Sequence, residues 1–112
     1  MPDEVRGEIR FYTGGPEEVA RMSASGEMRL AAPIGPLTPD RERWLRLLGW
    51  TVRVFVRGRD VTACCQYADD RVGRQCALFY RRNDQGELYL ADDGRPAMEL
   101  VDADVVIEVS RH

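Results

Sequence analysis

Apolar and polar residues alternate through several parts of this chain, and alternation at every second residue is the pattern of a strand with one buried face. Residues 5–11 show it, and residues 28–32 show it again. Between these stretches, Pro16 follows two glycines and precedes two acids, which is typical of a helix start. We therefore predict a strand, a short helix that ends at Gly26, and a second strand.

A proline-rich segment, residues 33–39, interrupts this pattern, because proline neither continues a helix nor fits a central strand. Thr38 then offers a capping hydroxyl, Pro39 suits the first helical turn, and Asp40 adds a first-turn acid. The spacing predicts a helix over residues 38–49. Its apolar side, which we expect to lie in the core, contains Trp44, Leu45, Leu47 and Leu48.

From Thr51 onward the alternation continues and predicts an antiparallel meander. Tight turns are predicted at Gly58-Arg59 and at Asp70-Arg71, followed by a loop that ends at Gly86 and a turn at residues 94–96. The last strand is expected to contain Val105, Ile107 and Val109.

These turns define which side chains of the meander share a face. The buried face is expected to carry Val52, Val54, Val56, Val61, Ala63, Cys65, Leu78 and Tyr80. A strand through Leu88 and Leu90 is expected beside Tyr80. The chain is therefore predicted to be one α+β domain, residues 1–112, in three parts: a strand-helix-strand segment (1–37), a helix (38–49) and an antiparallel β portion (50–112). About five strands of that portion are expected to curl into a small barrel or sandwich.

Charge and hydropathy narrow the functional classes. The chain has 16 basic residues, all arginine, and 19 acidic residues, for a net charge of −3. Acids are interleaved with the arginines, so the pattern argues against direct nucleic-acid binding, which needs a basic face. No run approaches the length of about 18 apolar residues that a membrane span requires. The first eight residues have neither a basic nor an apolar region, so we do not expect a secretory signal there. We expect a protein that works inside the cell that makes it, or that leaves this cell by lysis.

The three cysteines are interpreted as structural. Cys64 and Cys65 are neighbours in a predicted strand and would point to opposite faces, so they cannot chelate together. With Cys76 and the terminal His112 they do not make a plausible zinc set. The predicted register makes Cys65 and Cys76 cross-strand neighbours within disulfide range, but we expect reduced thiols in a cytoplasmic protein. No metal or cofactor is predicted.

Paired acids, such as Asp69-Asp70 and Asp92-Asp93, fall where turns are already indicated, and aspartate favours turns. The chain has no internal histidine to activate a serine or cysteine nucleophile. We therefore predict no catalytic residues and no enzymatic activity. A small hydrolase or redox protein that uses Cys64 or the acidic pairs is kept as an alternative, ranked after the two non-enzymatic functions given at the end of this section.

The face opposite the valines carries Phe55 and Phe79, which the predicted register makes cross-strand neighbours. Either the Trp44 helix or a protein partner could cover this face, and the internal interpretation is favoured for Phe79. Residues 1–37 and the acidic turns are then expected to form the partner surface. The predicted partner-binding residues are Phe55, Asp69, Asp70, Asp92 and Asp93.

Residues 52–62 follow the pattern V-x-V-x-V-x-G-x-D-V-T, which resembles a hairpin of small phage and prophage proteins, including virion and tail components. The resemblance extends from residue 51 to about residue 80. It implies a phage or mobile-element origin and a structural or partner-binding role, with no catalytic residues to carry over.

The expected function is therefore that of a non-enzymatic assembly protein, such as a minor virion or tail component. It would bind other proteins or form a homo-oligomer, without a small-molecule substrate or a membrane. The alternative is a small soluble inhibitor of a host defence or nucleic-acid-binding system.

Overall fold

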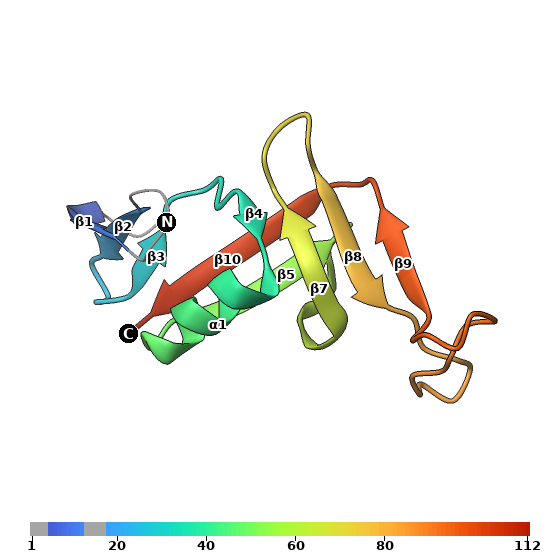
Figure 1. Ribbon diagram of the computed structural model, residues 1–112. Coiled ribbons are helices and arrows are strands. Elements are labelled where there is room, and N and C mark those ends of the chain that lie inside the picture. Colours follow the sequence, from blue (N-terminus) through green and yellow to red (C-terminus); the bar gives the residue numbers. More distant parts are fainter. Residues whose placement is uncertain (1–4, 13–17) are drawn as a thin grey trace.

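A computed structural model describes residues 5–12 and 18–112, which form two antiparallel sheets and one α-helix. The molecule is elongated, with extents of 51 × 33 × 27 Å and a radius of gyration of 15.7 Å (Figure 1). A compact domain of this length would have a radius of gyration of about 13 Å. The mixed α+β class is confirmed. Neither sheet closes on itself, so the barrel is not confirmed.

The larger sheet has six strands and is built around β10. Its strands, in spatial order, are β1 (Val5–Phe11), β2 (Glu18–Ser23), β3 (Met28–Leu30), β10 (Val105–Arg111), β5 (Thr51–Val56) and β6 (Arg59–Asp60). β10 pairs with β3 through Ser110 and Arg111 and with β5 along almost its whole length. The predicted strands at residues 5–11 and 28–32 and the last strand are therefore confirmed, although β3 is shorter than expected.

The helix predicted before Gly26 is wrong. Residues 18–23 form strand β2, which pairs with β1 on one side and β3 on the other, while the predicted start at residues 13–17 lies outside the described residues. Gly26, with a φ of +87°, turns the chain between β2 and β3 rather than ending a helix. Two-sided strand pairing outweighs the local helix-start signal, since propensity is a weak determinant beside tertiary pairing.

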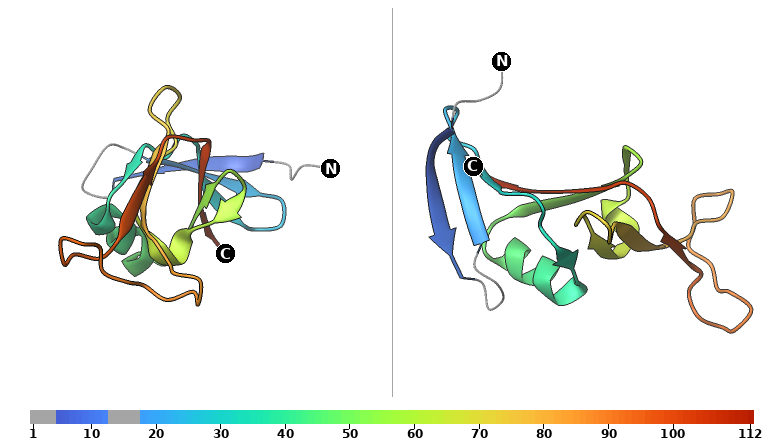
Figure 2. Two further views of the ribbon diagram at one scale, coloured as in Figure 1. Left: turned by 90° about the vertical axis from the view of Figure 1, so that its right-hand side faces the viewer. Right: turned by 90° about the horizontal axis from the view of Figure 1, so that it is seen from above.

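The second helix is confirmed as α1 (Pro39–Leu47). Thr38 caps it, its Oγ1 accepting a hydrogen bond from the Arg41 backbone N–H at 3.2 Å. Gly49, with a φ of +91°, follows the helix and redirects the chain into β5. Helix α1 lies along one side of β5 (Figure 2).

The expected apolar side of α1 is mostly not in the core. Leu45 is fully buried, but Trp44 is 57% exposed and Leu47 is 72% exposed. Leu48 is also exposed. The helix rests on the narrow floor formed by β5 and β10, and Leu45 is its one buried side chain, while the flanking apolar residues face outward.

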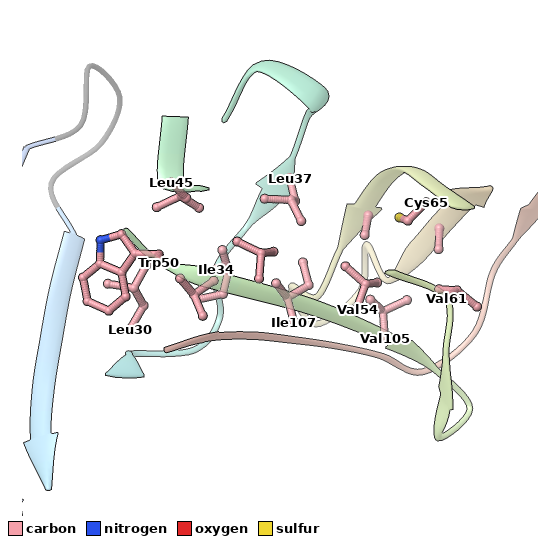
Figure 3. Packing of buried hydrophobic residues seen from close by; sticks show 14 of the residues in the cluster. Leu30, Ile34, Leu37, Leu45, Trp50, Val54, Val61, Cys65, Val105 and Ile107 are labelled. Carbon is pink, nitrogen blue, oxygen red and sulfur yellow. The ribbon is translucent and has the colours of Figure 1, made fainter. Parts of the chain in front are cut away.

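The core lies between this floor and the elements that cover it. Strands β5 and β10 point one face inward and together contribute Val52, Val54, Val56, Val105, Ile107 and Val109. Leu45 of α1 and Leu37 of β4 (Pro36–Leu37) pack over these residues, and Trp50 lies near Leu30 at one end (Figure 3). The opposite face of β5 and β10 is open to solvent.

The first hairpin turn lies at Arg57 and Gly58, not at Gly58-Arg59. Both turn residues are left-handed, with φ of 52° and 78°, and Phe55 pairs with Asp60. The Val61 N–H consequently donates to the Val54 carbonyl at 2.9 Å. This correction shifts each partner by two residues and keeps the parity, so Val54 and Val61 both stay buried as predicted.

Beyond this hairpin the meander is interrupted. A 3-10 turn, η1 (Thr62–Cys64), carries the chain into the second sheet and leaves Ala63 exposed, contrary to the prediction. The second sheet has four strands, in the order β4, β7 (Cys65–Asp69), β8 (Cys76–Tyr80) and β9 (Met98–Val101). It crosses the inner side of the larger sheet beside α1 (Figure 1).

The predicted turn at Asp70-Arg71 is also wrong, because β7 and β8 are joined by a longer loop, residues 70–75. Ala68 pairs with Ala77 and both are fully buried, which turns Leu78 and Tyr80 to the outer side of the sheet. Residues 88 and 90 form isolated bridges to Arg82 and Pro96 instead of a strand beside Tyr80.

Candidate protein-binding interface

The five predicted partner-binding residues are not brought together. Phe55 lies half-buried on the outer face of the six-stranded sheet, opposite Val106. Phe79 lies in the other sheet, opposite Cys65, and packs against the core. The two aromatic residues are therefore not neighbours. Asp92 is exposed, as is Asp93, which accepts a hydrogen bond from the Arg95 backbone N–H in a turn.

Asp69 and Asp70 make contacts inside the chain. Asp69 is 2% exposed and binds the guanidinium of Arg71, with an Oδ2–Nη2 distance of 2.7 Å. Hydrogen bonds from Arg71 hold the pKa of Asp69 below its usual value. The Asp70 carboxylate accepts the backbone N–H groups of Ile34 and Gly35 at 2.9 and 2.8 Å. Partner binding by these acids stays a prediction.

A second polar group holds the same proline-rich loop from the other side. The guanidinium of Arg41 donates to the carbonyls of Ile34 and Pro36 and forms an ion pair with Glu18, whose side chain is 7% exposed. Asp70 thus fixes the loop N–H groups while Arg41 fixes its carbonyls. Because backbone polar groups away from water need partners, this arrangement explains how an irregular loop closes one side of the core.

Cys76 is not paired with either of the two adjacent cysteines, Cys64 and Cys65. Cys65 lies opposite Phe79 and Cys76 lies opposite Asp69, so the expected proximity of Cys65 and Cys76 is wrong. All three thiols are free. Within the described part of the chain, no group of three or more His, Cys, Asp or Glu side chains is placed to hold a metal ion.

Burial should make Cys65 a slow nucleophile. Desolvation raises its pKa to about 11, so at pH 8 about one part in a thousand is thiolate, the reactive form. We expect iodoacetamide at pH 8 to label the half-buried Cys64 well before Cys65, with the Cys65 rate rising about tenfold per pH unit below its pKa. Fragment-ion mass spectrometry of the Cys64-Cys65 peptide measures both sites, and urea-unfolded protein is the control. Equal labelling rates in the folded protein would contradict this assignment.

The clearest unpartnered feature of the structure is the outer edge of β9. Ala97 accepts a hydrogen bond from the Arg81 N–H and donates to the Tyr89 carbonyl, both at 2.9 Å, and the Arg95 carbonyl accepts from Ala91 at 2.7 Å. All these bonds lie on the β8 side of the strand. Figure 1 shows β9 at the margin of the four-stranded sheet. Among the described residues, no strand pairs with the other side of residues 95–101, which we call the open edge.

An apolar surface adjoins the open edge on the outer side of the sheet. Paired residues share a face, and the ladder pairs Tyr67 with Leu78, Leu78 with Leu100 and Tyr80 with Met98, while Leu90 pairs with Pro96. We call this set the apolar strip; it comprises Tyr67, Leu78, Tyr80, Leu90, Met98 and Leu100. Leu90 is 66% exposed, Leu100 65% and Met98 38%.

An open strand edge beside exposed apolar side chains is a template for adding another strand. Lysine or inward-pointing charge usually protects such an edge; here Glu99 is the single charged residue of residues 96–101, and Pro96 lies near one end. The geometry therefore suits backbone pairing with a protein segment, with the apolar strip supplying contact area.

Sequence reasoning missed this site because it missed β9. A signal was present, since Met98 and Leu100 alternate with Glu99, but the stretch is short and lies between two turn segments. The exposure of the apolar strip could not be predicted, because the error in the predicted register between β7 and β8 placed Leu78 and Tyr80 in the core.

Comparison of the chain with known protein families, curated proteins and solved structures found no match. The helix formed by the described residues is too short to cross a membrane.

Proposed function

We propose that the chain is a non-enzymatic assembly protein that binds other proteins by strand addition at the open edge. The observation that carries the proposal is that no strand of the described part of the chain pairs with the outer side of residues 95–101, beside the exposed Leu90 and Leu100. Main-chain hydrogen bonds would supply affinity, and the apolar strip would supply specificity through alternate side chains.

The hairpin resemblance at residues 52–62 supports a narrower form of this proposal. In that form the protein is phage- or prophage-derived and acts in the host-cell cytoplasm or within a virion as a minor structural component. The elongated shape is compatible with such a role, since it presents the open edge at one end of the molecule, far from β1 (Figure 1).

Replacing Leu100 by lysine tests the proposal. The side chain is 65% exposed, so the change should alter the melting temperature by only a few degrees, while a charge inside the interface should oppose partner binding. We expect the amount of protein that co-purifies with the tagged chain from its native source to fall at least about tenfold, the equivalent of about 1.4 kcal/mol.

Val106→Lys is the matched control. Val106 is also an exposed apolar strand residue, at 52%, but it lies on the outer face of the six-stranded sheet. It should leave co-purification unchanged. An equal loss in both variants, or no loss in Leu100→Lys, would reject the open edge as the binding site.

A further inference from the structure

We infer that the occupant of the open edge is a second copy of this chain, which pairs antiparallel to the first about a two-fold axis at Met98. This inference rests on the proposed function, because it names the partner of the same site. Three observations lead to it: the direction of the free backbone groups, the register they permit, and the charges along the edge.

The hydrogen bonds of Arg95 and Ala97 determine which backbone groups are free. Both residues bond toward the β8 side, and neighbouring residues of an extended strand direct their N–H and C=O groups to opposite sides. The groups of Met98 and Leu100 therefore point to the open side, together with the Pro96 carbonyl. The missing N–H of Pro96 leaves no unused donor at that end.

Residues that share hydrogen bonds across a two-fold axis must both come from this outward set. The axis can then pass through Ala97, Met98, Glu99 or Leu100. An axis at Ala97 pairs Met98 with Pro96, which has no N–H to donate, and sets Leu100 against the turn at Gly94. An axis at Glu99 sets this carboxylate directly opposite its copy, which is destabilising. An axis at Leu100 pairs Met98 with Asp102, which lies beyond the end of β9, and leaves half of the open edge unused.

An axis at Met98 uses the whole edge, because Met98 is the middle residue of 95–101. Each Met98 N–H then meets the Met98 carbonyl of the other copy, and each Leu100 N–H meets the Pro96 carbonyl. On the outer face Leu100 lies against Pro96 of the second copy, so the two apolar strips join. On the inner face Arg95 pairs with Val101 and lies diagonal to Glu99 of the second copy, within reach of a long side chain.

The charges along the edge are thus complementary under this rotation. Each copy offers one base, Arg95, toward one end of the segment and one acid, Glu99, on the other side of the axis. Antiparallel pairing brings the base of one copy to the acid of the other, twice. An interface formed only by the open edge and the apolar strip of each copy belongs to the weak class, in which the total buried surface area is below about 1,200 Å². We therefore expect the dimer to form at micromolar rather than nanomolar concentration.

Cysteine cross-linking tests both the partner and the register. Two Met98 Cα atoms at the axis would be about 5.5 Å apart, within the range for a disulfide. Two Leu100 Cα atoms would be separated by about 14 Å, which is too far. Under mild oxidation we expect Met98→Cys to give at least tenfold more covalent dimer than Leu100→Cys or the wild-type chain, which reports the background of the native thiols. A dimer formed preferentially by Leu100→Cys would overturn the register.

Sedimentation equilibrium separates this inference from the proposed function. The wild-type chain should dimerise as concentration rises, whereas Met98→Lys, which sets like charges at the axis, should weaken the dimer at least tenfold. A wild-type chain that stays monomeric to about 500 µM, far above the expected range, would overturn the second copy as occupant. The Leu100→Lys result with co-purifying proteins would still decide whether the edge binds another partner.

Discussion

Replacing Leu45 by alanine is expected to lower the free energy of unfolding by about 2–5 kcal/mol. Leu45 is the buried residue of α1, with 0% exposure, and it seals the helix against the β5–β10 floor. The change removes apolar burial and leaves a cavity that this rigid floor cannot fill by collapse. For a domain whose total stability is about 5–15 kcal/mol, such a loss is large. Urea unfolding followed by circular dichroism measures it.

Leu47→Ala is the control for this experiment. It makes the same chemical change two residues away, at a side chain that is 72% exposed, and should alter the free energy of unfolding by less than about 0.5 kcal/mol. Comparable losses at both positions would show that α1 is not seated by Leu45 as described.

Replacing Arg41 by methionine should cost about 3–5 kcal/mol, because it removes a guanidinium from a buried carboxylate. Arg41 also donates to the Ile34 and Pro36 carbonyls, so the loss reaches the loop that closes the core. Methionine retains much of the apolar length of the side chain, which limits the effect to the polar contacts. Thermal and urea unfolding measure the change.

Arg43→Met is the matched control. Arg43 forms an ion pair with Asp40, with an Nη2–Oδ1 distance of 3.4 Å, and both side chains are exposed. Pairs of this kind contribute at most about 1 kcal/mol. Adding Glu18→Gln to Arg41→Met should recover part of the lost stability, because the carboxylate charge is no longer buried. A double variant as unstable as the sum of the two single variants would contradict the coupling between Arg41 and Glu18.

Local sequence signals predicted helices and strands well where residues close in sequence decide the structure. The Thr38-Pro39-Asp40 start of α1 and the valine alternation of β5 are examples, because capping and one-sided burial are short-range effects. The helix prediction for residues 18–23 failed because their conformation depends on β1 and β3, which pair with them on both sides. Strand pairing is a tertiary interaction, and the helix-start signal in the sequence at Pro16 carries no information about it.

Turn positions and one bulge decided how much of the candidate site could be predicted. A shift of two residues at Arg57-Gly58 preserved the buried face, and the loop at residues 70–75, four residues longer than the predicted turn, also preserves it. The bulge between Cys65 and Tyr67, in contrast, shifts the register by one residue and turns Leu78 and Tyr80 outward. In a strand with a two-residue period, an odd shift exchanges its faces. The acidic pair at Asp69 and Asp70 was found from sequence, but its hydrogen bonds to Arg71, Ile34 and Gly35 depend on contacts that no spacing reveals.

The central place of β10 in the six-stranded sheet also bears on biosynthesis. Strands β3 and β5 are translated early, yet the position between them stays vacant until residues 105–111 have left the ribosome. At typical elongation rates this interval is on the order of several seconds, which is long compared with hydrophobic collapse. Throughout it the valines of β5 lack their Ile107 and Val109 neighbours, so the nascent chain is a natural client for chaperones, and its core closes only after the last strand emerges.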